Sequence, residues 1–245
     1  TPRGPARPLL QHEVAGPFPP DCTKEAHDAM SHPAPTPRTR IRRLHEKAAY
    51  DRAVIDAILD TMPVAHVGHI VDGSPVVTPT LQWRKGDRVY WHGSSASRMQ
   101  KRAADEQVCL TVTLLDGMVL ARSGFEHSVN YRSVMVFGTA EVVEGAAAKE
   151  AHLRAMMEQM FPDRWNALRP ITPQELKATR ILSLPLTEAS AKLSTGHATE
   201  TPGDSSWPVW AGVIPIHLAV GQPEPAPDLA PGLPVPGYAS GYRIG

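Results

Sequence analysis

Residues 88–101 read RVYWHGSSASRMQK, and this stretch decides how the rest of the chain is interpreted. Its first half carries the β-branched and aromatic residues Val89, Tyr90 and Trp91, which favour a strand. The Gly/Ser run that follows predicts a turn, and the residues beyond it predict a helix with Met99 on its inner face. The stretch therefore predicts a strand, a turn and a helix start in direct succession.

The start of this helix has the chemistry of a phosphate-binding site. The first N–H groups of a helix have no partner within it and carry the positive end of the helix dipole. Arg98 and Lys101 share one helix face, and an arginine can make a bidentate bond to phosphate. Ser94, Ser95 and Ser97 add hydroxyl groups. The alternative is an ordinary surface helix with solvated cations; no GxxxxGK[ST] or GxGxxG motif competes for the phosphate.

Composition restricts the classes of partner. The 25 Lys+Arg balance the 25 Asp+Glu, so there is no electrostatic reason to expect nucleic acid or an anionic membrane as a partner. No apolar run reaches the length of about 18 residues that a membrane span needs. The two cysteines, Cys22 and Cys109, do not make a disulfide framework and favour reduced thiols in a cytoplasmic protein.

Prolines divide the chain into three parts. Most of the 25 prolines crowd into the two ends, so residues 1–37 are expected to be an extended or disordered leader. Residues 217–245 are expected to be a second tail of the same kind. Residues 38–216 have the size of one ordinary domain.

The hydrophobic pattern of this domain predicts mainly strands. A helix over 50–60 is followed by a hairpin of 64–71 and 75–83, joined at Asp72-Gly73, whose second strand is an edge or a broken ladder because of its prolines. Asp116-Gly117 predicts the turn of a second hairpin. The remaining predicted elements are a strand over 131–143 with a bend at Gly138, helices over 149–160 and 174–178, and a last strand over 181–186. Such an order predicts a small, closed or partly closed antiparallel β-barrel with peripheral helices.

His66 and His69 lie three residues apart in the first predicted strand of the hairpin. Side chains alternate between the two faces of a strand, so these imidazoles are expected to point to opposite sides. We therefore predict no metal ion at this pair.

Four blocks of the sequence, in this order, resemble one known family. They are VTPT at 77–80, YWHGSSASRM at 90–99, NYRSVMVFG at 130–138 and PVWAGVIP at 208–215. The family is the flavin-nucleotide-binding branch of the pyridoxamine 5′-phosphate oxidase-like superfamily, and within it the blocks are similar to the nitroimidazole-resistance (Nim) proteins. Over residues 38–216 the resemblance implies a mainly β fold, the FMN-binding split barrel, and a homodimer that holds FMN between its subunits.

The resemblance also assigns roles to residues. It places the FMN phosphate at the turn and helix start already described, and the edge of the isoalloxazine ring near backbone N–H groups of an earlier strand. The residues assigned to the turn and the phosphate are Gly93, Ser94, Ser95, Ser97, Arg98 and Lys101. The residues assigned to the ring edge are Thr78, Pro79 and Thr80.

Five further residues are assigned with alternatives. His92 aligns with a histidine near the flavin of Nim proteins, which implies a catalytic redox role; the alternative is a structural residue at a strand end. Tyr131, Arg132 and Ser133 are expected to approach the flavin. The alternative for Tyr131 and Arg132 is to brace the dimer interface, and the alternative for Ser133 is to bond a local backbone group. Trp210 is expected to cover the pocket, from its own or the partner subunit, or to be a packing anchor.

Two functions are consistent with these features. The first is an FMN-dependent oxidoreductase that reduces nitroaromatic or other small acceptors. The second is a non-catalytic carrier of flavin, haem or deazaflavin on the same barrel, since one fold hosts many functions. Oxidation of vitamin B6 itself is disfavoured, because the sequence has no second convincing basic cluster for a substrate phosphate.

Overall fold

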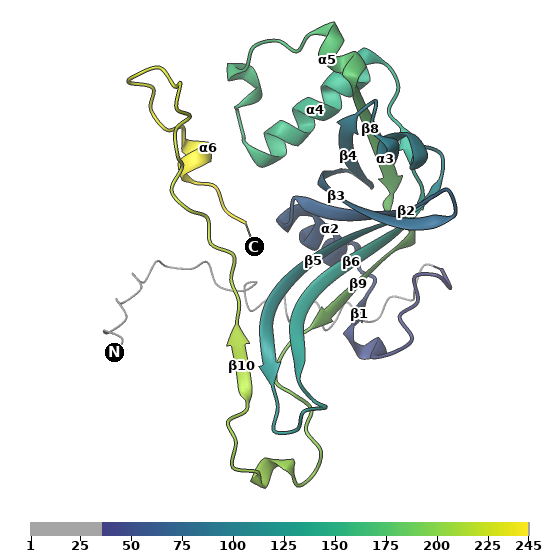
Figure 1. The fold of residues 1–245 in the computed structure, drawn as a ribbon, viewed down its shortest axis with the longest axis vertical. Coiled ribbons are helices and arrows are strands. Elements are labelled where there is room, and N and C mark those ends of the chain that lie inside the picture. The colour runs from purple at the N-terminus through teal and green to yellow at the C-terminus, as the bar shows by residue number, and fades with distance from the viewer. Residues whose placement is uncertain (1–35, 245) are drawn as a thin grey trace.

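The computed structural model describes residues 36–244 of the 245-residue chain (Figure 1). The predictions for Cys22 and for residues 1–35 lie outside the described residues. Within them, ten strands form one curled antiparallel sheet in the order β1-β9-β6-β5-β2-β3-β4-β8-β7, with β10 paired to β5.

The strands are β1 (Ala48–Ala49), β2 (Val64–Val71), β3 (Ser74–Lys85), β4 (Arg88–Ser94), β5 (Gln107–Leu120), β6 (Ser128–Thr139), β7 (Glu141–Val142), β8 (Thr179–Pro185), β9 (Ala189–Ser194) and β10 (Gly212–Pro215). The α-helices are α2 (Arg52–Thr61), α3 (Arg98–Arg102), α4 (Ala146–Met160), α5 (Pro173–Ala178) and α6 (Gly237–Ser240).

The first helix and hairpin are confirmed. The carboxylate of Asp51 accepts hydrogen bonds from the N–H groups of Ala53 and Val54, and so caps the start of α2. Asp72 and Gly73 join β2 to β3 with φ angles of 50° and 79°, the left-handed conformation that an Asp-Gly hairpin turn requires.

Two prolines lie within β3 without breaking its ladder with β2. The N–H of Gln82 donates to the Pro63 carbonyl at 2.7 Å, and hydrogen-bonded pairs recur at every second residue of an antiparallel ladder. Pro75 and Pro79 therefore stand where an N–H would point away from β2, so the ladder loses nothing. On that side β3 pairs with β4 only from Gln82 to Lys85, so its first half is a free edge, as the prolines predict.

The predicted turn at Asp116-Gly117 is wrong. β5 continues through this dipeptide, with only a shift of register against β6 after Leu115. The Asp116 carboxylate accepts two hydrogen bonds from Arg132 of β6, at 2.7 and 2.9 Å. A Cβ on Gly117 would lie 3.0 Å from the Ile214 carbonyl, so the glycine permits the close approach of β10 rather than a turn.

The predicted strand over 181–186 is confirmed as β8, but it is not the last strand, because β9 and β10 follow it. β9 reads ASAKLS and has no β-branched or aromatic residue, so its sequence does not favour a strand. Its pairing with β6 makes it a strand, and Ala189 and Ala191 are buried in the barrel interior.

Gly138 lies at a corner of the barrel, as predicted. The predicted strand over 131–143 is divided there: β6 pairs with β5 and β9, whereas β7 pairs with β8. A Cβ on Gly138 would lie 3.0 Å from a methyl group of Leu184, so the absent side chain lets the chain turn from one part of the sheet to the other.

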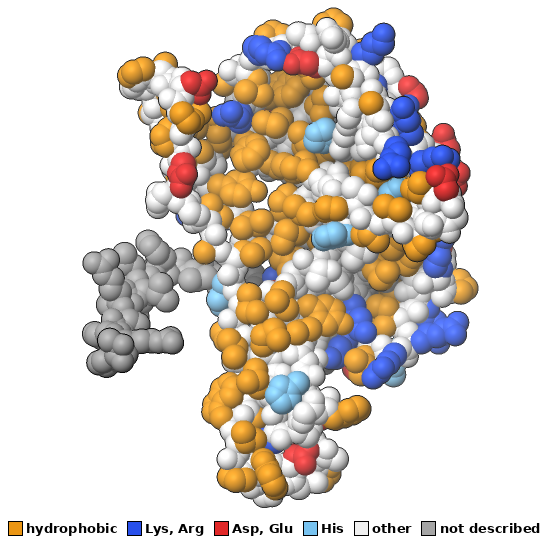
Figure 2. Space-filling model, in the orientation of Figure 1, with side chains coloured by type: hydrophobic (Ala, Val, Ile, Leu, Met, Phe, Trp, Pro, Cys, Tyr) orange, Lys and Arg blue, Asp and Glu red, His pale blue; other side chains and the backbone are white. Residues whose placement is uncertain are grey.

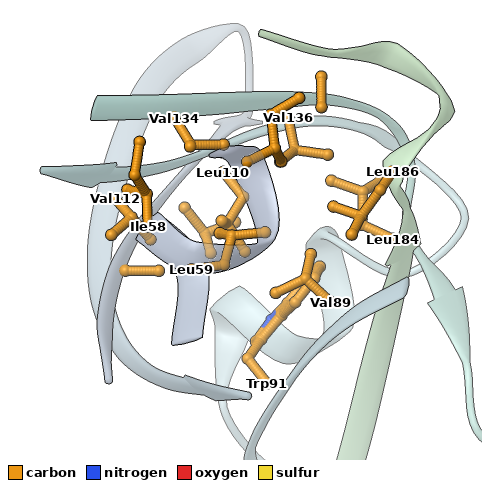
Figure 3. Close-up of a cluster of buried hydrophobic side chains, with 14 of the residues drawn as sticks. Ile58, Leu59, Val89, Trp91, Leu110, Val112, Val134, Val136, Leu184 and Leu186 are labelled. Carbon is orange, nitrogen blue, oxygen red and sulfur yellow. The ribbon is translucent and has the colours of Figure 1, made fainter. Parts of the chain in front are cut away.

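Alternation along the strands separates an interior from an outer face. Trp91, Leu110 and Val134 are among the side chains that fill the interior (Figure 3). On the outer side of β3, β4 and β8, the helices α4 and α5 bury a second cluster that includes Trp83 and Tyr90. The outer face of β2, β5 and the first half of β3 has no such layer among the described residues.

The end of the chain runs back over the domain. After β10 it forms no strand or helix until α6, and just beyond α6 Tyr242 stacks on Phe161 with ring centroids 5.6 Å apart. The Tyr238 hydroxyl accepts a hydrogen bond from Arg164 at 2.6 Å. A cavity of about 520 Å³ lies between this segment, α2 and the end of α4.

Among the described residues, no helix is both long and apolar enough to cross a membrane.

Candidate functional site

The turn between β4 and α3 is closed by its own hydrogen bonds. The Ser95 N–H donates to the Ala178 carbonyl at the end of α5, at 2.7 Å. The Ser97 N–H donates to the Ser94 carbonyl and the Ala96 N–H to the Ser94 hydroxyl. The expectation of free donors is therefore wrong for these residues, because a tight turn satisfies its own backbone. The Ser97 side chain makes no capping bond, so any anion would meet the first N–H groups of α3 instead.

Three cationic side chains belong to this end of the barrel. Arg98 and Lys101 are exposed on α3, as the sequence predicts. Arg180 is a third cation, which the sequence does not predict: it pairs with Gly93 across β4 and β8 and donates to the Gln100 carbonyl at 3.4 Å. Only the pairing of strands far apart in the chain brings it here, so no local pattern predicts it.

Gln100 is a buried polar residue beneath the turn, and it was also missed. Its side chain is 1% exposed, and neither amide atom has a partner among the described residues. A Cβ on Gly93 would lie 2.7 Å from Gln100 Nε2, so the glycine makes room for this amide. Leaving a buried polar group unpaired costs about 1–3 kcal/mol, which a bound group or water that bonds this amide would recover.

β3 and β4 separate beside this turn. The last pair of their ladder is Gln82 with Trp91. A continued ladder would pair Leu81 with His92 and Thr80 with Gly93, but the strands have parted there. Two unpaired strand edges therefore face each other at residues that the resemblance assigns to the flavin, and the β4 edge leads directly into the turn before α3.

The free edge of β3 does not offer the donors that were predicted. By the alternation that starts at Gln82, the N–H groups of Thr78 and Thr80 point toward β2, and Pro79 has no N–H. The donors that face the split belong to Val77 and Leu81. The position of the edge agrees with the prediction, whereas the residues that donate from it are shifted by one.

The predicted trio on β6 is divided between two faces. Tyr131 and Ser133 lie on the outer face, whereas Arg132 alternates with them and pairs with Asp116 through two hydrogen bonds. The Ser133 hydroxyl donates to the Lys192 carbonyl at 3.4 Å, the local bond that was the alternative to a flavin contact. At most two of the three side chains can therefore contact one ligand on the outer face.

Trp210 lies away from the turn within one chain. It precedes β10, which pairs with the far end of β5, and Figure 1 shows β10 at the opposite end of the molecule from α3. Its side chain is 63% exposed, with its ring over Gly212. Within one chain Trp210 is therefore not placed to cover this turn. A contribution from the partner subunit and the alternative of a packing anchor both stay predictions.

His92 lies on the outer face, at the margin of the layer formed by α4 and α5. Its ring is 5.9 Å from that of Trp83, and burial lowers the pKa of the imidazole, so it is neutral at neutral pH. Its Nδ1 atom is buried and has no partner among the described residues. A neutral imidazole with an unpaired nitrogen can form one hydrogen bond with a bound group.

The two histidines of β2 point to opposite faces, as predicted. His66 is exposed on the outer face, whereas His69 is 4% exposed on the inner side. The cavity beneath the C-terminal segment is lined by none of the predicted site residues. The candidate site is therefore the split and the turn, together with the outer face beside them.

These features define a β-barrel protein with exposed cations on α3, next to the point where β3 and β4 part. The family model described as pyridoxamine 5′-phosphate oxidase matches residues 51–193, and the chain belongs to this family. The expected antiparallel split barrel is thereby confirmed. No curated protein matches the sequence.

Two solved structures are similar over most of the chain. The flavocytochrome Anf3 from Azotobacter vinelandii is 46% identical with a TM-score of 0.85, over 87% of this chain and 100% of that one. An FAD- and haem-binding protein from Mycobacterium smegmatis is 39% identical with a TM-score of 0.76, over 80% of this chain and 97% of that one. A Bacteroides thetaiotaomicron chain named for 5-nitroimidazole antibiotic resistance is 21% identical with a TM-score of 0.49, over 59% of this chain and 85% of that one. The expected closeness to Nim proteins stays a prediction.

Proposed function

We propose that this chain is a redox protein that binds a flavin at the split between β3 and β4 and a haem on its outer face. The observation that carries the flavin is the combination of two parted strand edges with a cationic helix start, in a chain 46% identical to a flavocytochrome. When bound, the flavin supplies hydride and electron transfer, and the protein supplies binding, orientation and exclusion of water.

The family resemblance implies FMN, whereas we propose FAD. A relative of 39% identity is named for FAD, whose diphosphate presents two charged phosphate groups where FMN presents one. Arg98, Lys101 and Arg180 offer three cations for such a group. The edge donors of Val77 and Leu81 and the unpaired amide of Gln100 are suited to bond the polar atoms of the ring.

His92 fits a positioning role beside the flavin. Its lowered pKa keeps the ring neutral, so it would give one hydrogen bond rather than a positive charge to a bound group. Reduction of a small-molecule acceptor by the flavin is the activity we propose, with nitroaromatics as one class to test. A carrier without activity is the alternative.

The outer face supports a homodimer. Hydrophobic side chains gather over β5 and β10 on the face that Figure 2 shows. Leu115, Met118, Met135 and Ile214 are each 40–49% exposed on these and the neighbouring strand. Contiguous apolar surface of this kind favours association, and a second copy there would bring its Trp210 toward the first subunit.

An absorption spectrum of the purified protein, followed by anaerobic addition of NADPH, tests the function. We expect both a flavin band and a Soret band, with the flavin band bleached by the reductant and restored by a small acceptor. A flavin band that no reductant and acceptor pair can cycle would favour the carrier. A protein that takes up no flavin when reconstituted with FAD or FMN would contradict the proposal.

Replacement of Arg98 by alanine is expected to weaken flavin binding by about 1.5–3 kcal/mol, or roughly 10- to 150-fold in Kd. The reason is the loss of a charge-assisted hydrogen bond to phosphate. Flavin fluorescence titration of the apoprotein measures the change. Arg154→Ala removes an exposed arginine from α4 and is the matched control, expected to bind flavin as the wild type does. Equal affinities of the two variants would remove α3 from the flavin site.

A further inference from the structure

We propose that His66 of β2 is the protein ligand of the haem iron, and that the haem covers the outer face of β2 and β3. The inference rests on the proposed function, which includes a haem but no ligand for it. A haem held by a protein needs an imidazole with an accessible nitrogen, or another axial donor, next to an apolar surface.

The His66 imidazole meets the first requirement. β2 is paired on both edges, with β3 and with β5, so the backbone that carries His66 is held on both sides. The side chain is exposed, and no hydrogen bond or ion pair joins its ring to another residue of 36–244. Both ring nitrogens are therefore accessible for coordination, and no existing bond has to be broken.

The surroundings of His66 meet the second requirement. Strand register places Val64 and Ile70 of β2 on the same face, together with Val77 and Leu81 of β3. These four side chains are 37–65% exposed, so they form a contiguous apolar patch on the outer face. The cross-strand neighbour of His66 on β3 is Pro79, which adds no polar side chain. A flat, largely apolar macrocycle would cover this group of residues.

The sheet next to the imidazole lacks one side chain. Gly68 is the next residue of β2 on this face, and a Cβ there would make only ordinary contacts, at 3.5 Å or more, with Cys109 of β5. The glycine therefore leaves the sheet flat between Val77 and Cys109. A planar ligand held by His66 has room to extend in this direction.

The other histidines of the sheet and its helices are less suited. His69 is buried on the inner side, with Nδ1 3.4 Å from the Val67 carbonyl. The ring of His92 packs against Trp83, and the ring of His152 lies 4.3 Å from that of Tyr90. The Nδ1 atom of His127 lies 2.9 Å from the Ser123 carbonyl in the loop between β5 and β6. Three further described histidines, His45, His197 and His217, are exposed outside the strands.

The position of His66 also bears on electron exchange. Pro79 is its cross-strand neighbour and belongs to the free edge of β3 that we assign to the flavin. His92 faces the same side of the sheet. A haem on His66 and a flavin at the split would thus be neighbours on one face, as a protein that passes electrons between them requires.

The test compares the full-length wild type with His66→Ala after titration with haemin in the presence of FAD. We expect His66→Ala to bind haemin at least roughly 10-fold more weakly. Replacing a residue that only orients a metal ligand already lowers metal affinity by about this factor. Its Soret band should shift, while FAD binding and the far-ultraviolet circular dichroism remain those of the wild type. Added imidazole should restore the wild-type spectrum, which it would not do if His66 were only structural. His197→Ala and His217→Ala are the matched controls and should keep the wild-type Soret band.

Two outcomes would overturn the inference, and they are distinguishable. If His66→Ala keeps the wild-type Soret band and haemin affinity, another residue is the ligand and the proposed function stands. If the wild type binds FAD but not haemin, the haem part of the proposed function fails as well. In the first of these outcomes, a loss of the Soret band in one of the two control variants would place the ligand in that segment.

Discussion

Replacement of Trp91 by alanine is expected to lower the free energy of unfolding by about 3 kcal/mol. Trp91 is 0% exposed in the barrel interior, where Phe or Trp to Ala changes cost about 3–5 kcal/mol through lost burial and the cavity left behind. Its Nε1 atom has no partner among the described residues, so removing it recovers part of a desolvation cost of about 1–3 kcal/mol. The two terms together place the effect near the lower end of the range. Urea unfolding of the cofactor-free protein, at one protein concentration, measures it.

Two variants sharpen this test. Trp91→Phe keeps most of the ring and removes the unpaired N–H, so we expect it to stay within about 1.5 kcal/mol of the wild type. Trp207→Ala removes a side chain that is 67% exposed and is expected to change the free energy by about 0.5 kcal/mol or less. If Trp91→Ala were no more destabilising than Trp207→Ala, the barrel interior would not be the main core of the fold.

Elements whose signals are local could be predicted from the sequence. The hairpin of β2 and β3 follows from alternating apolar residues on both sides of Asp72-Gly73, because the turn and its strands are neighbours in the chain. The same dipeptide at Asp116-Gly117 predicts a turn that does not form, because β5 continues through it. There, the side chain of Arg132 and the approach of β10 decide the structure, and both come from other parts of the chain.

The candidate site divides in the same way. The turn after His92 and the two cations of α3 were predicted, because strand, turn and helix follow one another directly. Gln100 and Arg180 were missed, since the space under Gly93 and the register of β8 are set by tertiary packing. The backbone donors of β3 were misassigned by one residue, because which N–H groups face β2 depends on the bond of Gln82 to Pro63.

The outer face offers the prediction with the largest effect, on the association of two chains. Leu115 is 45% exposed on β5, within the apolar surface that we assign to the dimer. In a two-fold symmetric dimer, Leu115→Lys places two charges in the interface at once. Each buried, unpaired charge costs several kcal/mol, so the dissociation constant should rise by more than about 1,000-fold. Sedimentation equilibrium should show the mass of two chains for the wild type and of one chain for the variant.

The control for this experiment is Leu168→Lys. The exposed fraction of Leu168, 39%, is similar to that of Leu115. Leu168, however, lies between α4 and α5, away from the outer faces of β5 and β6. A general effect of an added lysine on solubility or folding would change both variants equally, whereas loss of the dimer in Leu115→Lys alone identifies the face. A wild type that sediments as a single chain at all concentrations would contradict the homodimer. It would also contradict a role for Trp210 over the flavin, because within one chain Trp210 and the turn after β4 lie at opposite ends of the molecule.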